Sequence, residues 1–305
     1  MRVLVTGGCG FIGHHLCRRL AADGADVNVL DDLSTGDGDR LPGASRLHVG
    51  DVADPEAVDD AMHAVDACVH LAAIASVPAC QADWHRATAV NLLGSVNVFA
   101  AAARHGNRPV VYASSAAVYG PADPPIAETD PTGPLSNYGC DKLASEWHAA
   151  AAGRAHGLPT VGLRFFNVFG PGQDPRSPYS GVITHFHTAL AEGRPPLIHG
   201  DGQQTRDFIY VDDVVDAIAR ALHGTESSAP VVNVCTGREI DLLSLARTMS
   251  EISDQPVAPA FGPPRPGDIR HSRGDPGRAA DLLGFRAAVS LRDGLQQLIV
   301  SDAGV

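Results

Sequence analysis

The sequence lacks the features that mark secreted, membrane-bound or nucleic-acid-binding proteins. Its six cysteines contain no Cys-x-x-Cys pair and lie mostly among apolar residues, which indicates reduced, intracellular thiols. No apolar run is long enough to span a membrane, and the first predicted strand begins at residue 2, which leaves no room for a signal peptide. Only 23 lysines and arginines oppose 35 acids, so the net charge of −12 argues against nucleic acid or an anionic membrane as a partner. We therefore expect a cytoplasmic protein.

A metal centre is not expected either. The 14 histidines include no His-Glu-x-x-His motif and no cluster with cysteine, so we interpret them as surface or packing residues. The 305 residues, of which 44% are apolar, can form one large α/β unit or two domains with a substantial core.

The N-terminal stretch predicts a dinucleotide site. Residues 2–6 have an uninterrupted apolar centre, as expected of a strand buried on both faces of a parallel sheet. Glycines at 7, 10 and 13 then suit a tight turn, close approach of a ligand to the backbone, and packing of the next helix, predicted over 11–22. The free N–H groups at that helix start would bind a pyrophosphate.

Acids follow the next predicted strand, residues 26–32. Asp31 lies 18 residues after Gly13, where a carboxylate would accept hydrogen bonds from the adenosine ribose. Asp32 beside it would repel a 2′-phosphate, which favours NAD over NADP. Residues 46–49 predict a third strand, followed by Asp51 where adenine would lie. Asp54 and Pro55 then predict the cap and first residue of a helix.

Strands and helices continue to alternate. Residues 66–73 and 110–115 predict two more strands, and residues 83–106 predict a long helix between them. That helix has two apolar faces, one for the sheet and one available to another subunit. This alternation predicts a Rossmann-type doubly wound parallel sheet with its ligand site at the carboxyl ends of the strands.

The predicted chemistry lies in the next helix. Tyr138 and Lys142 are four residues apart, so they share a helix face if Ser136 or Asn137 is the cap. A nearby ammonium and the positive nicotinamide would lower the tyrosine pKa from about 10, giving an acid/base group for neutral pH.

These motifs resemble the extended short-chain dehydrogenase/reductase superfamily and, within its NAD-dependent epimerase/dehydratase family, the nucleotide-sugar 4-epimerases. The superfamily's T-G-x-x-G-x-x-G and Y-x-x-x-K motifs are both present, starting at Thr6 and Tyr138. Four further stretches carry the resemblance: 112–120 (YASSAAVYG), 163–171 (LRFFNVFGP), 200–208 (GDGQQTRDF) and 265–272 (RPGDIRHS).

The resemblance implies three groups of site residues. The catalytic group is Ser115, Tyr138 and Lys142. The residues implied to contact NAD are Gly7, Gly10, Phe11, Ile12, Gly13, Asp31, Asp32, Asp51, Val52, Leu71, Ala72, Ala73, Asn91, Ala113, Tyr138 and Lys142. The residues implied to contact a nucleotide sugar, UDP-linked by the same resemblance, are Ser76, Ser115, Asn167, Val182, Ile198, Arg206, Arg265 and Asp268. The two arginines suit a diphosphate because guanidinium forks match phosphate oxygens.

The implied reaction is transient oxidation at C4 of the sugar. Tyr138 would take the C4 hydroxyl proton as hydride passes to the nicotinamide, and the turned 4-ketose would take the hydride back on its other face, so NAD should stay bound. Ala116 and Ala117 stand where related dehydratases and decarboxylases carry acids, which disfavours those reactions. Ser272 stands where some glucose-restricted epimerases carry tyrosine, which leaves room for UDP-GlcNAc or UDP-glucuronate.

Two other functions stay open at this point. One is an NAD(P)-dependent nucleotide-sugar ketoreductase or dehydratase with the same catalytic set, and the other is a non-catalytic dinucleotide-binding protein. We divide the chain into an NAD-binding domain, 1–167, and a smaller, partly interleaved substrate-binding α/β domain, 168–305. The second half predicts helices over 181–193, 211–223 and 241–253 and a strand over 230–234. By the resemblance, a homodimer would form through the helices 83–106 and 136–157.

Overall fold

The computed structural model describes residues 1–173, 181–224, 229–255, 257–265 and 267–302. Its central sheet is built from β1 (Arg2–Thr6), β2 (Asp26–Asp31), β3 (Arg46–Val49), β4 (Ala67–His70), β5 (Val110–Ser115), β6 (Thr160–Phe165) and β11 (Val231–Val234). All pairings in this sheet are parallel, and the order is β11-β6-β5-β4-β1-β2-β3. Six of these strands follow the order of a doubly wound dinucleotide-binding sheet, so the predicted fold class is confirmed.

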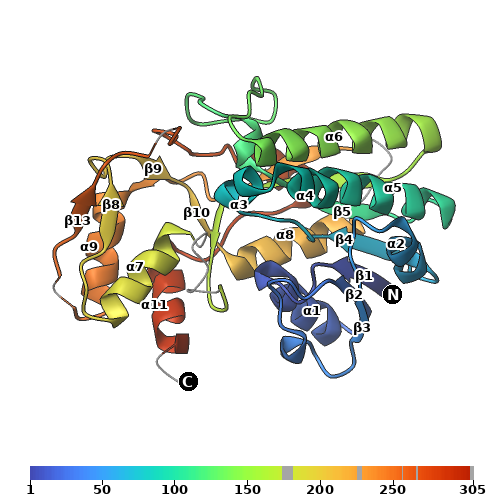
Figure 1. The fold of residues 1–305 in the computed structure, drawn as a ribbon, viewed down its shortest axis with the longest axis horizontal. Helices are drawn as coiled ribbons and strands as arrows, with labels where there is room; N and C mark the ends of the chain where they lie inside the picture. Colours follow the sequence, from blue (N-terminus) through green and yellow to red (C-terminus); the bar gives the residue numbers. More distant parts are fainter. Residues whose placement is uncertain (174–180, 225–228, 256, 266, 303–305) are drawn as a thin grey trace.

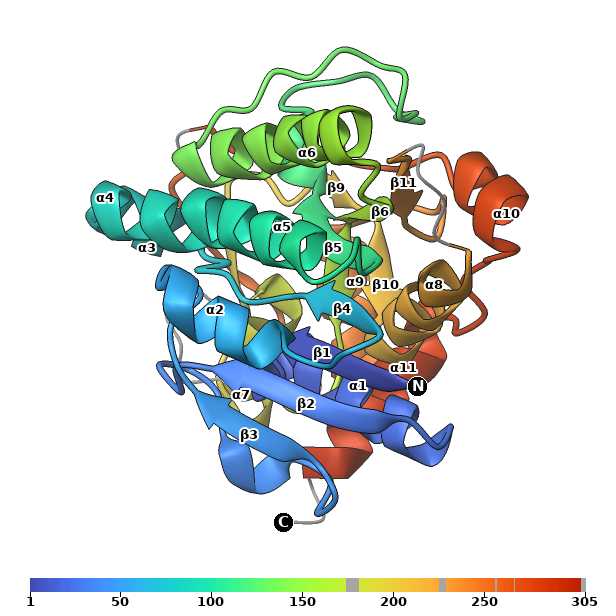
Figure 2. The same ribbon diagram turned by 90° about the vertical axis from the view of Figure 1, so that its right-hand side faces the viewer.

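Helices cover both faces of the sheet (Figure 2). One face carries α2 (Pro55–Met62), α3 (Val77–Ala82), α4 (Trp84–Thr88), α5 (Gly94–Arg104) and α6 (Asn137–His156). The other carries α1 (Phe11–Ala22), α8 (Val211–His223) and, beside α8 and β11, α10 (Gly277–Leu283).

The alternation of side chains along β1 explains this double cover. Val3 and Val5 belong to the core under α1 and α8, whereas Leu4 belongs to the core under α2 and α5. Because successive side chains of a strand point to opposite faces, an apolar strand without alternating polar residues requires a helix layer on each side.

Local signals set the helix starts. Ser136 caps α6 by accepting a hydrogen bond from the backbone N–H of Gly139 (3.1 Å), and α6 ends at Gly157, whose φ is +67°. Asp54 caps α2 and Pro55 is its first residue, as predicted. The start of α6 places Tyr138 in its first turn.

The long helix predicted over 83–106 is present as an unbroken helical run, Trp84 to Arg104, but its middle is π-helical. It consists of α4, a π-helical segment η2 (Ala89–Leu93), and α5. Asn91, within η2, uses its side-chain amide to bind both backbone groups of Ile74, at 2.8 and 3.2 Å. Such π-helical insertions re-aim a side chain within a helix, and here the side chain is a predicted NAD contact.

The second half of the chain adds a smaller lobe at one end of the sheet (Figure 1). It contains α7 (Val182–Ala191), α9 (Leu242–Ile252), α11 (Leu291–Asp302) and the strands β7 (Asn167–Phe169), β8 (Leu197–His199), β9 (Thr205–Arg206), β10 (Phe208–Tyr210), β12 (Ile240–Asp241) and β13 (Ala260–Gly262). These strands form three two-stranded sheets, β10-β7, β12-β9 and β13-β8. Short 3₁₀ turns are η1 (Gly38–Arg40) and η3 (Ala116–Val118).

The two halves of the chain interleave. The strand predicted over 230–234 is present as β11, but it pairs with β6 at the edge of the central sheet, and α8 packs on that sheet too. The division at 167/168 stays a prediction. Residues 170–180 are rich in proline and glycine, which predicts a connector, and of these residues 174–180 lie outside the described part of the chain. In the described ranges no helix combines the length and the apolar character needed to cross a bilayer.

Candidate active site

The glycine-rich turn between β1 and α1 is crowded on its inner side and open at one position. Gly7 has a φ of +71°, and a Cβ there would lie 2.6 Å from the backbone nitrogen of Ala72. A Cβ at Gly13 would overlap the carbonyl oxygen of Gly7. At Gly10 a Cβ would meet nothing nearer than that oxygen, at 3.4 Å. Gly10 is also the N-cap of α1 and offers the helix no side-chain acceptor, so the first amides remain available to a pyrophosphate.

Asp31 ends β2 beside this turn. Its carboxylate accepts hydrogen bonds from the backbone N–H of Cys9 and of Leu33, each at 2.9 Å, and it is buried. The carboxylate is thereby held against the turn at the position predicted for a ribose acceptor. Residues 71–73 continue from β4 on the other side of β1, where the N–H of Leu71 bonds the Thr6 carbonyl at 3.0 Å.

Asp32 and Asp51 share a partner that the sequence reasoning missed. Arg86, on α4, lies 2.5 Å from the Asp51 carboxylate and 3.4 Å from that of Asp32. The three residues are separated by up to 54 positions, and nothing near Arg86 in the sequence marks it as part of a site.

The three predicted catalytic residues come together where β5 meets α6. Ser115 is the last residue of β5, and its Oγ accepts a hydrogen bond from the N–H of Ala117 at 3.1 Å. Lys142 is buried, and its Nζ donates to the Ala113 carbonyl at 3.0 Å and lies 5.8 Å from the centre of the Tyr138 ring. Burial lowers the Lys142 pKa to about 8, so the side chain is mainly charged at neutral pH.

The predicted lowering of the tyrosine pKa is not found in the protein alone. Burial raises the pKa of Tyr138 to about 12, and the hydrogen bond with Ser115 opposes this only in part. The prediction included the charge of a bound nicotinamide as well as that of Lys142; in the protein without cofactor, desolvation has the larger effect on the pKa of Tyr138.

A buried polar network lies next to the predicted catalytic residues and links β5, β6 and α6. Glu146, two turns after Tyr138 on α6, accepts a hydrogen bond from Ser114 at 2.5 Å and pairs with both sides of the Arg164 guanidinium, at 2.9 and 2.7 Å. The Arg164 and Glu146 side chains are only 6% and 5% exposed. Arg164 also lies 4.7 Å from the centre of the Tyr119 ring. This network joins β5, β6 and α6 and was not predicted, because it links residues far apart in sequence.

Two of the predicted substrate residues contact each other. Arg206, on β9, forms an ion pair with Asp268, and its Nη1 donates to the carbonyls of Thr205 and Ile269, each at 2.7 Å. Burial lowers the Arg206 pKa. Its neighbour Asp207 is fully buried and accepts hydrogen bonds from Thr236 and from the amides of residues 237 and 274, so it ties two other segments of the chain to the end of β9.

The other predicted substrate residues are more scattered. Asn167 on β7 and Arg265 have exposed side chains, and Val182 begins α7. Ser76 caps α3 by accepting from the N–H of Ala79 at 3.1 Å. Ile198 is buried in the core of the small lobe, and the NAD candidate Val52 is buried in the core under α2 and α5. Their roles in binding stay predictions.

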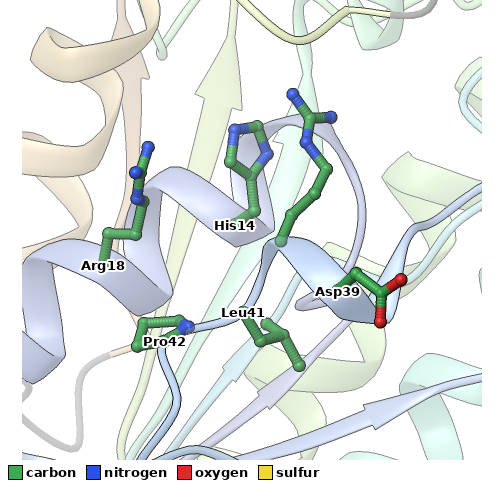
Figure 3. Close-up of a pocket in the computed structure, with 6 residues that line it drawn as sticks. His14, Arg18, Asp39, Leu41 and Pro42 are labelled. Atoms are coloured by element: carbon green, nitrogen blue, oxygen red, sulfur yellow. The ribbon is translucent and has the colours of Figure 1, made fainter.

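A separate hollow of about 510 Å³ lies between α1 and the segment 39–42. It is lined by His14 and Arg18 from α1 and by residues 39–42, as Figure 3 shows, and it includes none of the residues predicted to bind NAD. His14 is bonded to the Gly10 carbonyl at 3.0 Å, and burial lowers its pKa to about 4. No group of three or more His, Cys, Asp or Glu within the described residues is arranged to hold a metal ion.

Comparison with known proteins finds relatives that match nearly the whole chain. The chain is 38% identical to a UDP-glucose 4-epimerase of Mycolicibacterium smegmatis, over 98% of this chain and 97% of that protein. Its structure is similar to that of a UDP-glucose 4-epimerase from Thermotoga maritima with UDP-glucose (TM-score 0.95, 33% identity, 100% and 99% of the two chains). It is also similar to a UDP-N-acetylglucosamine 4-epimerase from Methanobrevibacter ruminantium in complex with UDP-N-acetylmuramic acid (TM-score 0.94, 32% identity, 99% and 98%).

The family model matches the part of the chain that holds the glycine-rich turn, the predicted catalytic residues and the last strand of the central sheet. The match runs from residue 3 to residue 235, and the predicted family is confirmed. The chain belongs to the NAD dependent epimerase/dehydratase family.

Proposed function

We propose that this protein is an NAD-dependent UDP-sugar 4-epimerase. The observation that carries the proposal is the meeting of Ser115, Tyr138 and Lys142 beside a glycine-rich turn whose open position is Gly10. The residues that follow Ser115 are Ala116 and Ala117, so the chain offers no carboxylate there for dehydration or decarboxylation. The similar proteins that are named 4-epimerases support the same reaction.

The cofactor fits the residues present. The uncapped start of α1 would bind its pyrophosphate, Asp31 its adenosine ribose, and Lys142 its nicotinamide ribose. Bound NAD supplies the hydride acceptor and donor.

Side chains of the protein would then transfer the proton of the sugar C4 hydroxyl. The Tyr138 oxygen takes the proton from the sugar C4 hydroxyl and later returns it, and Ser115 donates a hydrogen bond that favours the phenolate. Because burial holds the pKa of Tyr138 at about 12 in the protein without cofactor, the positive charge of the nicotinamide would be required to bring it toward neutrality.

The small lobe would anchor the nucleotide. Arg206 and Arg265 would bind the diphosphate, with Asp268 near the nucleotide ribose and Asn167, the first residue of β7, contacting the same ligand. Firm anchoring of the nucleotide would leave the hexose free to turn over between the two hydride transfers. The small Ser272 supports acceptance of an N-acetylated or carboxylated hexose beside UDP-glucose.

A cofactor-free incubation tests the function. Purified protein is incubated separately with UDP-glucose, UDP-N-acetylglucosamine and UDP-glucuronate, and the products are resolved by NMR. We expect the C4 epimer of at least one of them to form without added cofactor. If all three stay unchanged even after NAD is added, the proposal is wrong.

We also propose a homodimer. Trp84 on α4, Leu93 in η2 and Trp147 on α6 are exposed apolar side chains on one helix layer, where α4 packs against α6 (Figure 2). Burying them against a second copy would remove three large apolar side chains from water. Light scattering should give a dimer mass for the wild type and a monomer mass for Trp147→Glu. Leu282→Glu, which changes an exposed leucine on α10, should stay dimeric, and a monomeric wild type would contradict the proposal.

We propose the cytoplasm as the location. All six cysteines are free and five of them are buried, which suits a reducing compartment.

A further inference from the structure

Arg86 joins parts of the molecule that surround the predicted adenosine site. It lies on α4, which follows β4 by way of α3, whereas Asp32 directly follows β2 and Asp51 follows β3. The two ion pairs, at 2.5 Å to Asp51 and 3.4 Å to Asp32, therefore run across the carboxyl edge of the sheet from one side of β1 to the other. The path of this bridge passes the end of β2, where Asp31 is held.

The position of Arg86 is fixed locally. Asp83 caps α4 by accepting the backbone N–H of Arg86 at 2.9 Å, so the first turn of the helix presents this residue. The guanidinium is only partly exposed, as are the two carboxylates it binds. A planar guanidinium that already binds two acids loses little side-chain freedom when a ligand enters beneath it.

The charges at this edge require such a group. Asp31, Asp32 and Asp51 place three carboxylates around the position of the adenosine, and a bound dinucleotide adds a negative pyrophosphate at the start of α1. Without a cation, these like charges would disfavour the bound cofactor. Arg86 supplies the positive charge and offers a flat face suited to an adenine ring.

We propose that Arg86 closes the adenosine end of the NAD site and slows release of the cofactor between turnovers. This proposal rests on the proposed function for the identity of the cofactor. It gives the chain a means of keeping NAD bound, as a reaction that regenerates NAD in each cycle requires.

The test measures release of the dinucleotide itself. Protein loaded with NADH is mixed with a large excess of NAD, and loss of the bound NADH fluorescence gives the dissociation rate. We expect Arg86→Ala to release NADH about tenfold faster than wild type, the scale of one charge-assisted contact at a half-exposed site. Arg86→Lys keeps the positive charge but loses the planar guanidinium, so its NADH dissociation rate should lie between those of wild type and Arg86→Ala. Epimerisation by Arg86→Ala should also increase on addition of NAD, unlike that of the wild type.

A matched control is available on the same helix layer. Arg104 on α5 pairs with Asp59 at 2.7 Å, but this pair is exposed and lies away from the predicted NAD residues. Arg104→Ala should release NADH at the wild-type rate. Equal rates for Arg86→Ala and wild type would overturn the role of Arg86 while leaving the proposed function intact. A wild type that binds neither NADH nor NAD would overturn both.

Discussion

Replacing Glu146 by glutamine should destabilise the protein strongly. The change keeps the size of the side chain but leaves the buried Arg164 guanidinium without its counter-charge. Loss of one partner of a buried ion pair costs about 3–5 kcal/mol. Arg164 keeps a contact with the Glu128 carbonyl at 3.4 Å and with the Tyr119 ring at 4.7 Å, which places the expected loss near the lower value, about 3 kcal/mol. That is a large part of the 5–15 kcal/mol typical of a folded domain.

Urea unfolding followed by circular dichroism, at pH 7.5 and a fixed NAD concentration, measures this loss. Asp59→Asn makes the same chemical change in the exposed pair with Arg104 and should cost no more than about 1 kcal/mol. Replacing Glu146 and Arg164 together by leucine and methionine should cost less than Glu146→Gln, because no charge is then left unpaired. A Glu146→Gln protein within about 1 kcal/mol of wild type would refute the reasoning.

Two further predictions concern single side chains, the half-buried Tyr138 and the buried His70. Tyr138→Phe removes the group that exchanges the C4 proton, so epimerisation measured by NMR should fall about 10³-fold with the fold unchanged by circular dichroism; a small loss would exclude Tyr138 as the acid/base. His70 is fully enclosed between Thr6 and Ser95, and burial lowers its pKa from 6.5 to about 3. As the pH falls from 6.5 toward 3, this histidine is protonated in the unfolded chain but not in the folded one. The free energy of unfolding therefore decreases over that pH range. Protonation of His70 should lower the free energy of unfolding of the wild type by about 2 kcal/mol between pH 8 and pH 5. Urea unfolding of His70→Gln should not show this contribution. Parallel pH profiles for the two proteins would contradict the prediction.

The sequence predicted the elements whose signals are local. The glycines after β1, the Asp54 and Pro55 start of α2 and the cap of α6 at Ser136 each act within a few residues, and the structure has all three. The doubly wound order followed because strand and helix patterns alternated in the first half of the chain. The family motifs identified Ser115, Tyr138 and Lys142 as the predicted catalytic residues, and the structure brings these three together.

The features that the sequence did not predict depend on distance in space. Arg86 reaches acids 35 and 54 residues away, and Glu146 reaches Ser114 across 32 residues, so no local pattern marks either one. The pKa of Tyr138 was predicted from Lys142 and a bound nicotinamide, whereas burial, which a sequence does not display, has the largest effect on it in the protein without cofactor. The pairing of β11 with β6 likewise joins two strands from different halves of the chain.

The central claim is that the hydride removed from the sugar C4 carbon returns to the same sugar. It can be tested with a UDP-hexose deuterated at C4, chosen from the substrates that the protein accepts, in ordinary water and without added cofactor. The account predicts the C4 epimer with its deuterium fully retained at C4, because the label leaves and returns while the ketose stays in the pocket. An epimer that has lost the deuterium to solvent would contradict transient oxidation at C4.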